Sequence, residues 1–146
     1  MKKILLLVIC VFSLNMFGQD TTNNWSNDYK TVLETAKSQN KAIVFYFIDA
    51  DNSEKDRLIQ SELFGSQEFK SLASKVVLLK VYSLETSGLS EAQRAYSKRL
   101  IGHYNPQNKF PASVTVDANE MVIATLNEDI NTAGITTYLT VLKSGL

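Results

Sequence analysis

The residues from Asp49 to Asp56, DADNSEKD, gather the polar side chains of this sequence that are best suited to chemistry. Four acids, an asparagine, a serine and a lysine follow directly after the apolar run AIVFYFI. Carboxylates and hydroxyls bind hard cations, act as general acids and bases, and also cap helices. The stretch is therefore a candidate cation site, a candidate catalytic cluster or a helix start.

A calcium loop of the EF-hand type does not fit this stretch. Asp49, Asp51 and Ser53 have the alternating spacing of calcium ligands. The sixth position, however, is Glu54 where a glycine permits the sharp turn, and the twelfth is Gln60 where a glutamate closes the coordination sphere. The flanking pattern is also strand then helix, which excludes an EF-hand and leaves a weak cation site as an alternative.

A hydrolytic site at Ser53 would need a base to activate the hydroxyl. The only histidine is His103, and no sequence pattern aligns it with Ser53. A non-thiol enzyme that uses Ser53 and Asp56 stays an alternative.

The simplest interpretation of the acidic stretch is a helix N-terminus. Ser53 and Asp56 form an S-x-x-D capping box, in which the serine accepts a hydrogen bond from an early amide and the aspartate reaches back. Asp51, Glu54 and Asp56 would also lie at the positive end of the helix dipole. We favour this structural interpretation.

Length and charge point to one ordinary globular domain. The chain has 146 residues, 45% of them apolar, with 15 basic and 15 acidic side chains. It has no basic run and no interleaving of arginine with aromatic residues, so the sequence gives no sign of nucleic-acid binding.

The first residues are typical of a cleavable export signal. Lys2 and Lys3 precede an apolar segment, residues 4–12, that is too short to span a bilayer, and the most suitable cleavage point lies between Gly18 and Gln19. We therefore expect a signal peptide over residues 1–18, a polar lead-in over 19–24, and one domain over 25–146. The mature protein would be periplasmic or secreted, with no transmembrane segment.

Cysteine usage excludes one class of chemistry. The only cysteine, Cys10, lies inside the predicted signal peptide, and its surroundings do not favour lipidation. After cleavage the chain would have no thiol, which excludes thiol-disulfide oxidoreductase activity.

The hydrophobic pattern predicts the element order α, β, α, β, α, β, β, α. The helix between the first two strands requires a parallel crossover, whereas the DANE turn indicates an antiparallel hairpin at the end. The expected elements are a helix capped by Ser26, a strand over 42–48, a helix from Ser53 to Gly65 that restarts at Ser66, a strand over 76–82, a helix with a Ser90–Gln93 capping box, strands over 113–116 and 121–126, and a helix capped by Thr132.

Three segments in this order resemble the thioredoxin-like superfamily, over about residues 25–143. They are NWSNDYKTVLETAKSQNKAIVFYF, ELFGSQEF and KFPASVTVDANEMV. The resemblance implies an α/β thioredoxin-like fold. Its central mixed sheet would contain parallel strands and a C-terminal antiparallel hairpin, flanked by helices.

The resemblance also places the acidic stretch where the family has its redox motif, Cys-x-x-Cys. Ser53 and Asp56 stand at the two cysteine positions, and Phe47 stands where the family has a buried acid for proton transfer. Nucleophile, resolving thiol and proton acceptor would all be absent. The chain is similar to an exported thioredoxin-like domain that lacks the redox motif.

In the related fold the bond before the proline equivalent to Pro111 is cis, and the residue before it, here Phe110, can pair with an extended peptide. The resemblance therefore implies a groove between two segments, whose candidate residues are Asn52, Glu54 and Lys55 on one side and Phe110, Pro111 and Ala112 on the other. A purely structural role for the cis proline is the alternative. We expect a non-catalytic module that binds a protein or an extended peptide in the cell envelope, without a cofactor or metal. One alternative is non-thiol chemistry or weak cation binding at Ser53 and Asp56. Another is a stabilising role in an envelope assembly.

Overall fold

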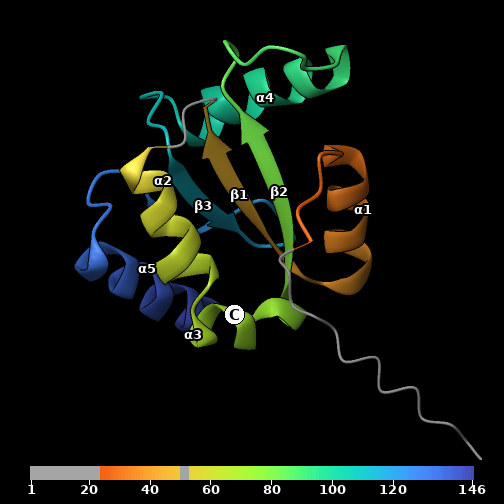
Figure 1. The fold of residues 1–146 in the computed structure, drawn as a ribbon. Coiled ribbons are helices and arrows are strands. Elements are labelled where there is room, and N and C mark those ends of the chain that lie inside the picture. The colour runs from red at the N-terminus through yellow and green to blue at the C-terminus, as the bar shows by residue number, and fades with distance from the viewer. Residues whose placement is uncertain (1–23, 50–52) are drawn as a thin grey trace, which may run out of the picture.

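The computed structural model describes residues 24–49 and 53–146, which form a four-stranded mixed sheet in the order β2-β1-β3-β4. Strands β1 (Ala42–Ile48) and β2 (Val76–Tyr82) are parallel. Strand β3 (Ala112–Val116) is antiparallel to β1 and to β4 (Val122–Leu126). The predicted parallel pair and final hairpin are confirmed, and Figure 1 shows the sheet at the centre of the molecule.

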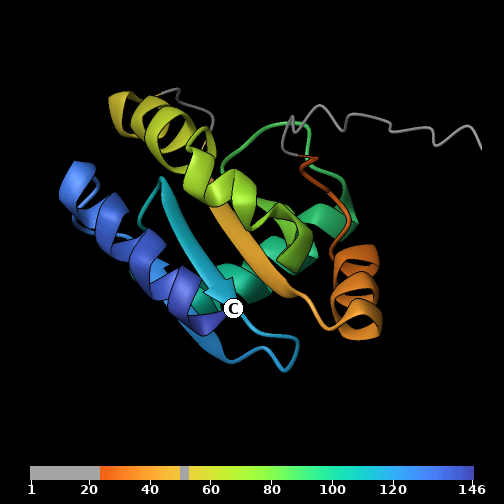
Figure 2. The same cartoon turned by 90° about the horizontal axis from the view of Figure 1, so that it is seen from below.

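Helices cover both faces of the sheet. The elements on one face are α2 (Glu54–Leu58), the π-helical turn η1 (Ile59–Phe64), α3 (Gln67–Ser71) and α5 (Thr132–Gly145), and those on the other are α1 (Tyr29–Gln39) and α4 (Glu91–Tyr104). A 3-10 turn, η2 (Ala73–Lys75), leads into β2. Figure 2 shows α5 and α1 on opposite sides of the sheet.

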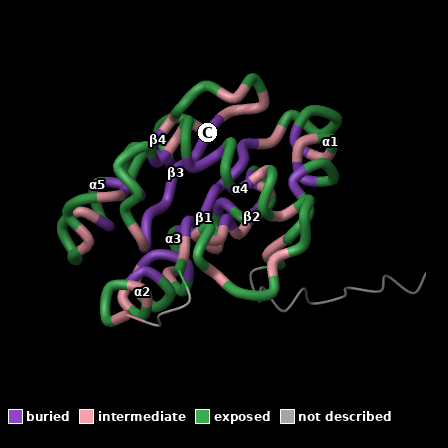
Figure 3. The backbone as a smooth tube through the Cα atoms, turned by 90° about the horizontal axis from the view of Figure 1, so that it is seen from above, coloured by how far each residue is buried: buried purple, intermediate pink, exposed green. Residues whose placement is uncertain are grey.

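Strand β1 is buried on both faces, as its unbroken apolar sequence predicted. Val44 and Tyr46 join the core under α2, η1 and α5, while Phe45 and Phe47 join the core under α1 and α4. Because side chains alternate along a strand, one apolar run supplies both cores. Figure 3 shows the central strands buried and the outer turns of the helices exposed.

Two of the predicted helix caps are wrong by one or two residues. Asp28, not Ser26, caps α1 and accepts hydrogen bonds from two amides of its first turn. The Ser26 amide instead donates to Leu78 O at 2.9 Å, in an isolated bridge to β2. Similarly, Asn131 rather than Thr132 caps α5. Neighbouring Ser, Thr, Asn and Asp residues are all good caps, so tertiary pairing decides between them.

The predicted helix starts at Ser66 and Ser90 are confirmed, whereas α4 continues past His103, which the sequence placed after the helix. Ser66 caps α3, and Ser90 and Gln93 form both hydrogen bonds of the predicted capping box. The π-helical turn was not predicted. It ends at Gly65, whose amide donates to Gln60 O at 2.9 Å.

No described helix is long and apolar enough to cross a membrane. The predicted signal peptide, and all of the lead-in except Asn24, fall outside the described residues.

Candidate functional site

Three segments that are distant in the sequence meet at one end of the sheet. Ile48, at the end of β1, lies opposite Tyr82 at the end of β2. Phe47 lies opposite Ala112, the first residue of β3. Asp49 after β1, the loop after β2 and the residues that precede β3 are therefore brought to the same end of the sheet, where Figure 1 also shows the start of α2.

Ser53 caps α2 as predicted. Its Oγ accepts a hydrogen bond from the Asp56 amide at 3.1 Å. The second half of the predicted capping box is wrong, because the Asp56 carboxylate does not reach back to the helix start. It accepts a hydrogen bond from the hydroxyl of Tyr46 on β1 instead. Asp56 thus ties the first turn of α2 to the centre of the sheet.

Tyr46 is packed among aromatic side chains. It is fully buried, and its ring centroid lies 5.5 Å from that of Trp25 and 5.0 Å from that of Phe64. Burial, with the hydrogen bond to Asp56 as a second cause, raises the pKa of Tyr46 above its usual value of 10. The hydroxyl therefore stays protonated at physiological pH and serves as the donor to Asp56.

Phe47 is fully buried at the position that the resemblance assigns to a proton-transfer acid. Its ring centroid lies 6.3 Å from that of Phe45, in the core beneath α1 and α4. A phenyl ring in this environment can neither accept nor donate a proton. At this position the end of β1 therefore contributes to core packing and not to proton transfer.

The peptide bond between Phe110 and Pro111 is cis, as the resemblance implied. Pro111 and Ala112 are buried, whereas Phe110 is half-buried. The loop before them is shaped by the buried side chain of Asn105, which donates to Lys109 O at 2.7 Å and accepts from the Lys109 amide at 3.0 Å. The sequence analysis missed Asn105, although an asparagine directly before a proline in a turn-rich loop was an available signal.

A cleft of about 670 Å³ opens beside Phe110. Half of its lining residues come from the loop after β2, which the sequence analysis did not single out. The lining residues are Asp49, Ser83, Leu84, Glu85, Thr86, Ile101, Asn108 and Phe110. The Thr86 Oγ1 atom is buried and has no hydrogen-bond partner among the described residues.

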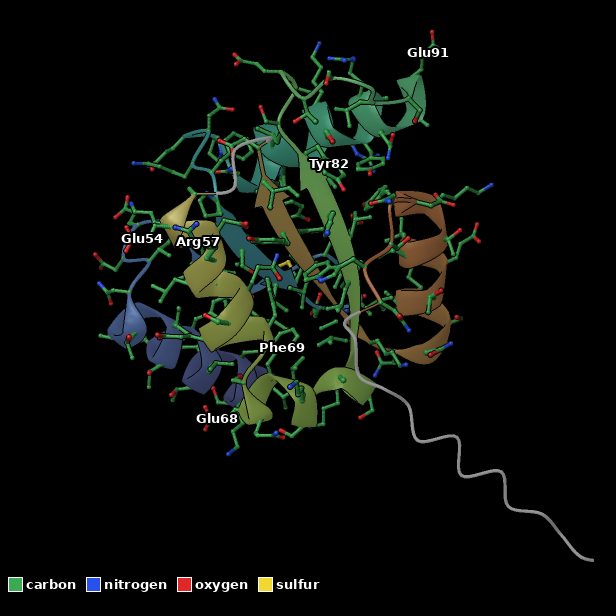
Figure 4. All side chains as sticks on the ribbon, viewed as in Figure 1. Glu54, Arg57, Glu68, Phe69, Tyr82 and Glu91 are labelled. Atoms are coloured by element: carbon green, nitrogen blue, oxygen red, sulfur yellow. The ribbon has the colours of Figure 1, made fainter. Side chains whose placement is uncertain are left out.

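Of the other predicted groove residues, Glu54 and Lys55 do not line this cleft. Glu54 and Lys55 are exposed on the first turn of α2, where Figure 4 shows Glu54. Asn52 falls outside the described residues. A groove between α2 and Phe110 stays a prediction, and the cleft that the structure describes lies toward the loop after β2.

The structure gives no support to a serine-histidine pair. His103 is exposed near the end of α4, with its ring centroid 4.5 Å from that of Tyr104. No hydrogen bond joins it to Ser53 in the part of the chain that the structure describes. Across residues 24–49 and 53–146, no three His, Cys, Asp or Glu side chains gather closely enough to hold a metal ion.

Solved structures similar to this chain include an oxidoreductase, a disulphide isomerase and a thioredoxin. The DsbH oxidoreductase is 27% identical, with 84% of this chain and 83% of its own covered and a TM-score of 0.65. A disulphide isomerase from Xylella fastidiosa Temecula1 is 18% identical, with 78% and 87% covered and a TM-score of 0.55. A thioredoxin from Thermus thermophilus is 13% identical, with 82% and 85% covered and a TM-score of 0.56.

No protein-family model and no curated protein sequence matches the chain. The fold and the structural neighbours nevertheless agree with the resemblance seen in the sequence. The sequence has a single cysteine, so one chain cannot form an internal disulfide. The chain therefore has a thioredoxin-like fold, and its sequence lacks the Cys-x-x-Cys motif.

Proposed function

We propose that this protein is an exported, non-catalytic module that binds an extended peptide or a protein partner at the end of the sheet, around Phe110. The observation that carries the proposal is the cleft beside Phe110, at the edge where β1, β2 and β3 meet. Ligand sites in open α/β sheets commonly lie in a crevice at the carboxyl ends of the strands.

The lining of the cleft suits a peptide. Phe110, Leu84 and Ile101 offer apolar contact, and Leu84 is already 37% exposed. The Thr86 hydroxyl is a buried polar group that a peptide backbone could satisfy. An extended peptide would pair with the Phe110 backbone and place alternate side chains in the cleft.

The polar groups at the start of α2 favour binding over catalysis. The Ser53 hydroxyl accepts from an amide, and the Asp56 carboxylate accepts from Tyr46. Both groups thus have structural partners within the chain. No pair of thiols exists that could exchange electrons with a substrate disulfide.

Capture with matched variants tests the binding site. The immobilised domain would be exposed to cell-envelope extract and the bound protein identified by mass spectrometry, followed by titration calorimetry with that protein. We expect Phe110→Ala and Leu84→Glu to weaken binding at least about tenfold, which corresponds to roughly 1.4 kcal/mol. Ser38→Glu, an identical change of charge at an exposed residue near the end of α1, should leave this binding unchanged. Equal recovery by all variants would refute a site at Phe110.

The alternative of non-thiol chemistry or a cation at Ser53 and Asp56 makes different predictions. Ser53 would be labelled by a phosphonate probe, or calcium would raise the melting temperature and a chelator would lower it. Neither response is expected from side chains that are already hydrogen-bonded within the fold.

The proposed export depends on a cleavable signal peptide over residues 1–18, and it can be tested separately. The protein recovered from the envelope should begin at Gln19, as shown by N-terminal sequencing. A mature chain that begins at Met1 would contradict the proposal.

A further inference from the structure

The two edge strands of the sheet, β2 and β4, differ in whether another segment of the chain is hydrogen-bonded to their outer side. The outer side of β2 is bridged by Ser26, whose amide donates to Leu78 O at 2.9 Å and whose carbonyl accepts from the Lys80 amide at 3.1 Å. Strand β4, at the opposite edge, is paired with β3 alone. Within the part of the chain that the structure describes, no segment pairs with its outer side, and Figure 3 shows β4 outside β3.

Strand β4 lacks the residue types that usually protect an edge. Edge strands commonly carry a lysine, an inward-pointing charge or a proline that blocks pairing with another chain. The sequence of β4, VIATL, has none of these. Its start is apolar and exposed, with Met121 at 67% and Val122 at 55% of their full accessibility. An irregularity in the β3–β4 register occurs near Val122, and pairing is regular from Ala124 to Leu126.

A groove of about 550 Å³ runs along β4 and continues onto α5. All five residues of the strand line it, and α5 contributes Thr137 and the 41% exposed Val141. Its charged lining residues are Glu128 and Asp129, and the lining contains no lysine, arginine or histidine. An occupant with basic side chains would therefore be electrostatically complementary to this groove.

We propose that β4 binds an extended, lysine- or arginine-containing segment of a partner protein as a fifth strand of the sheet. The backbone of β4 supplies the hydrogen bonds, Val122 and Val141 give apolar contact, and Glu128 and Asp129 select basic side chains. This site is separate from the cleft at Phe110, since β4 contributes no residue to that cleft.

A second copy of the chain fits this edge less well. Residues 121–129, MVIATLNED, contain no lysine or arginine, so β4 of a second copy would bring no basic side chain to Glu128 and Asp129. It would instead bring a second pair of acidic residues to the same interface, where like charges that lie close together are destabilising. A basic partner is therefore favoured over self-association.

A synthetic nine-residue peptide in which valine or threonine alternates with lysine is the probe. We expect it to bind the full domain, to shift the amide resonances of residues 121–129, and to slow hydrogen exchange along β4. The same peptide with glutamate in place of lysine, and a version N-methylated at alternate residues, should both fail to bind. The first control removes charge complementarity, and the second removes the backbone donors that strand addition requires.

Protein variants test separately the contribution of strand pairing and that of the acidic residues in the groove. Val122→Lys, at an exposed position, adds the protecting charge that β4 lacks and should abolish binding of the lysine peptide. The double variant Glu128→Lys, Asp129→Lys should weaken peptide binding at least about fivefold. The matched control Glu34→Lys, Glu91→Lys makes the same change of net charge at exposed residues on α1 and α4 and should bind like the unmodified protein. Figure 4 shows Glu91 at the far end of α4.

Four results would overturn the proposal: no binding of the lysine peptide at millimolar concentration, equal binding of the N-methylated peptide, resonance shifts confined to other elements, or a dimer in sedimentation experiments that Val122→Lys converts to a monomer.

Discussion

The start of α2 and the outer edge of β4 leave different groups available for binding. At α2 the polar side chains are bonded within the chain, Ser53 to an amide and Asp56 to Tyr46. At β4 the backbone has strand pairing on one side only, and the neighbouring apolar side chains are exposed. Substitutions near α2 should therefore change the stability of the fold, whereas substitutions at the exposed positions of β4 should change binding with little effect on stability.

The largest loss of stability is expected for Tyr46→Ala. It removes a fully buried ring packed against Trp25 and Phe64, so we expect the free energy of unfolding to fall by about 3–5 kcal/mol. Thr125→Ala, at an exposed position of β4, should change it by no more than about 0.5 kcal/mol. Guanidinium unfolding measures both. Similar losses in the two variants would contradict the distinction between the regions.

Tyr46→Phe isolates the hydrogen bond from the packing. The ring stays, but the Asp56 carboxylate loses its donor, and we expect a loss of about 1–3 kcal/mol. A double-mutant cycle with Asp56→Ala should give a coupling energy of about 0.5–3 kcal/mol. A coupling energy near zero would show that Asp56 does not anchor α2 to the sheet.

A smaller effect is expected for Ser53→Ala. The variant removes the side-chain cap of α2 and should lower stability by about 1 kcal/mol. Ser53→Gly should lose only a few tenths of a kcal/mol, because glycine is tolerated at this position. Thermal unfolding compares the two, and the opposite order would argue against a capping role.

The smallest effect on stability is expected for Val122→Lys. Val122 is 55% exposed, so the variant should unfold within about 0.5 kcal/mol of the unmodified protein. Denaturant unfolding of this variant is also the control for its loss of peptide binding. A large loss of stability would mean that β4 is more tightly packed than its exposure indicates.

Much of the fold followed from local patterns. The apolar run over 42–48 predicted a strand buried on both faces, and the Ser90–Gln93 spacing predicted a capping box that forms as expected. The resemblance to thioredoxin-like proteins gave the cis bond before Pro111. Such features depend on residues close in sequence, or on a pattern shared across the fold.

The site was less predictable. The spacing of Ser53 and Asp56 indicated a reciprocal capping box, but Asp56 pairs with Tyr46, which lies ten residues earlier on another element. The loop that lines the cleft, including Thr86, had no local signal, because its role arises from lying beside Phe110. Contacts between distant segments are not encoded in spacing along the chain.

The sequence by itself determined that this protein cannot use a pair of thiols, since it contains one cysteine, and that Ser53 begins a helix. Only the tertiary structure decided which polar groups are hydrogen-bonded within the chain and which strand edge is left without a pairing partner among the described residues. Folding brings Tyr46 within reach of Asp56, covers β2 with Ser26, and leaves β4 at the edge of the sheet. Residue type limits the available chemistry, whereas strand order and packing determine which groups can meet a partner.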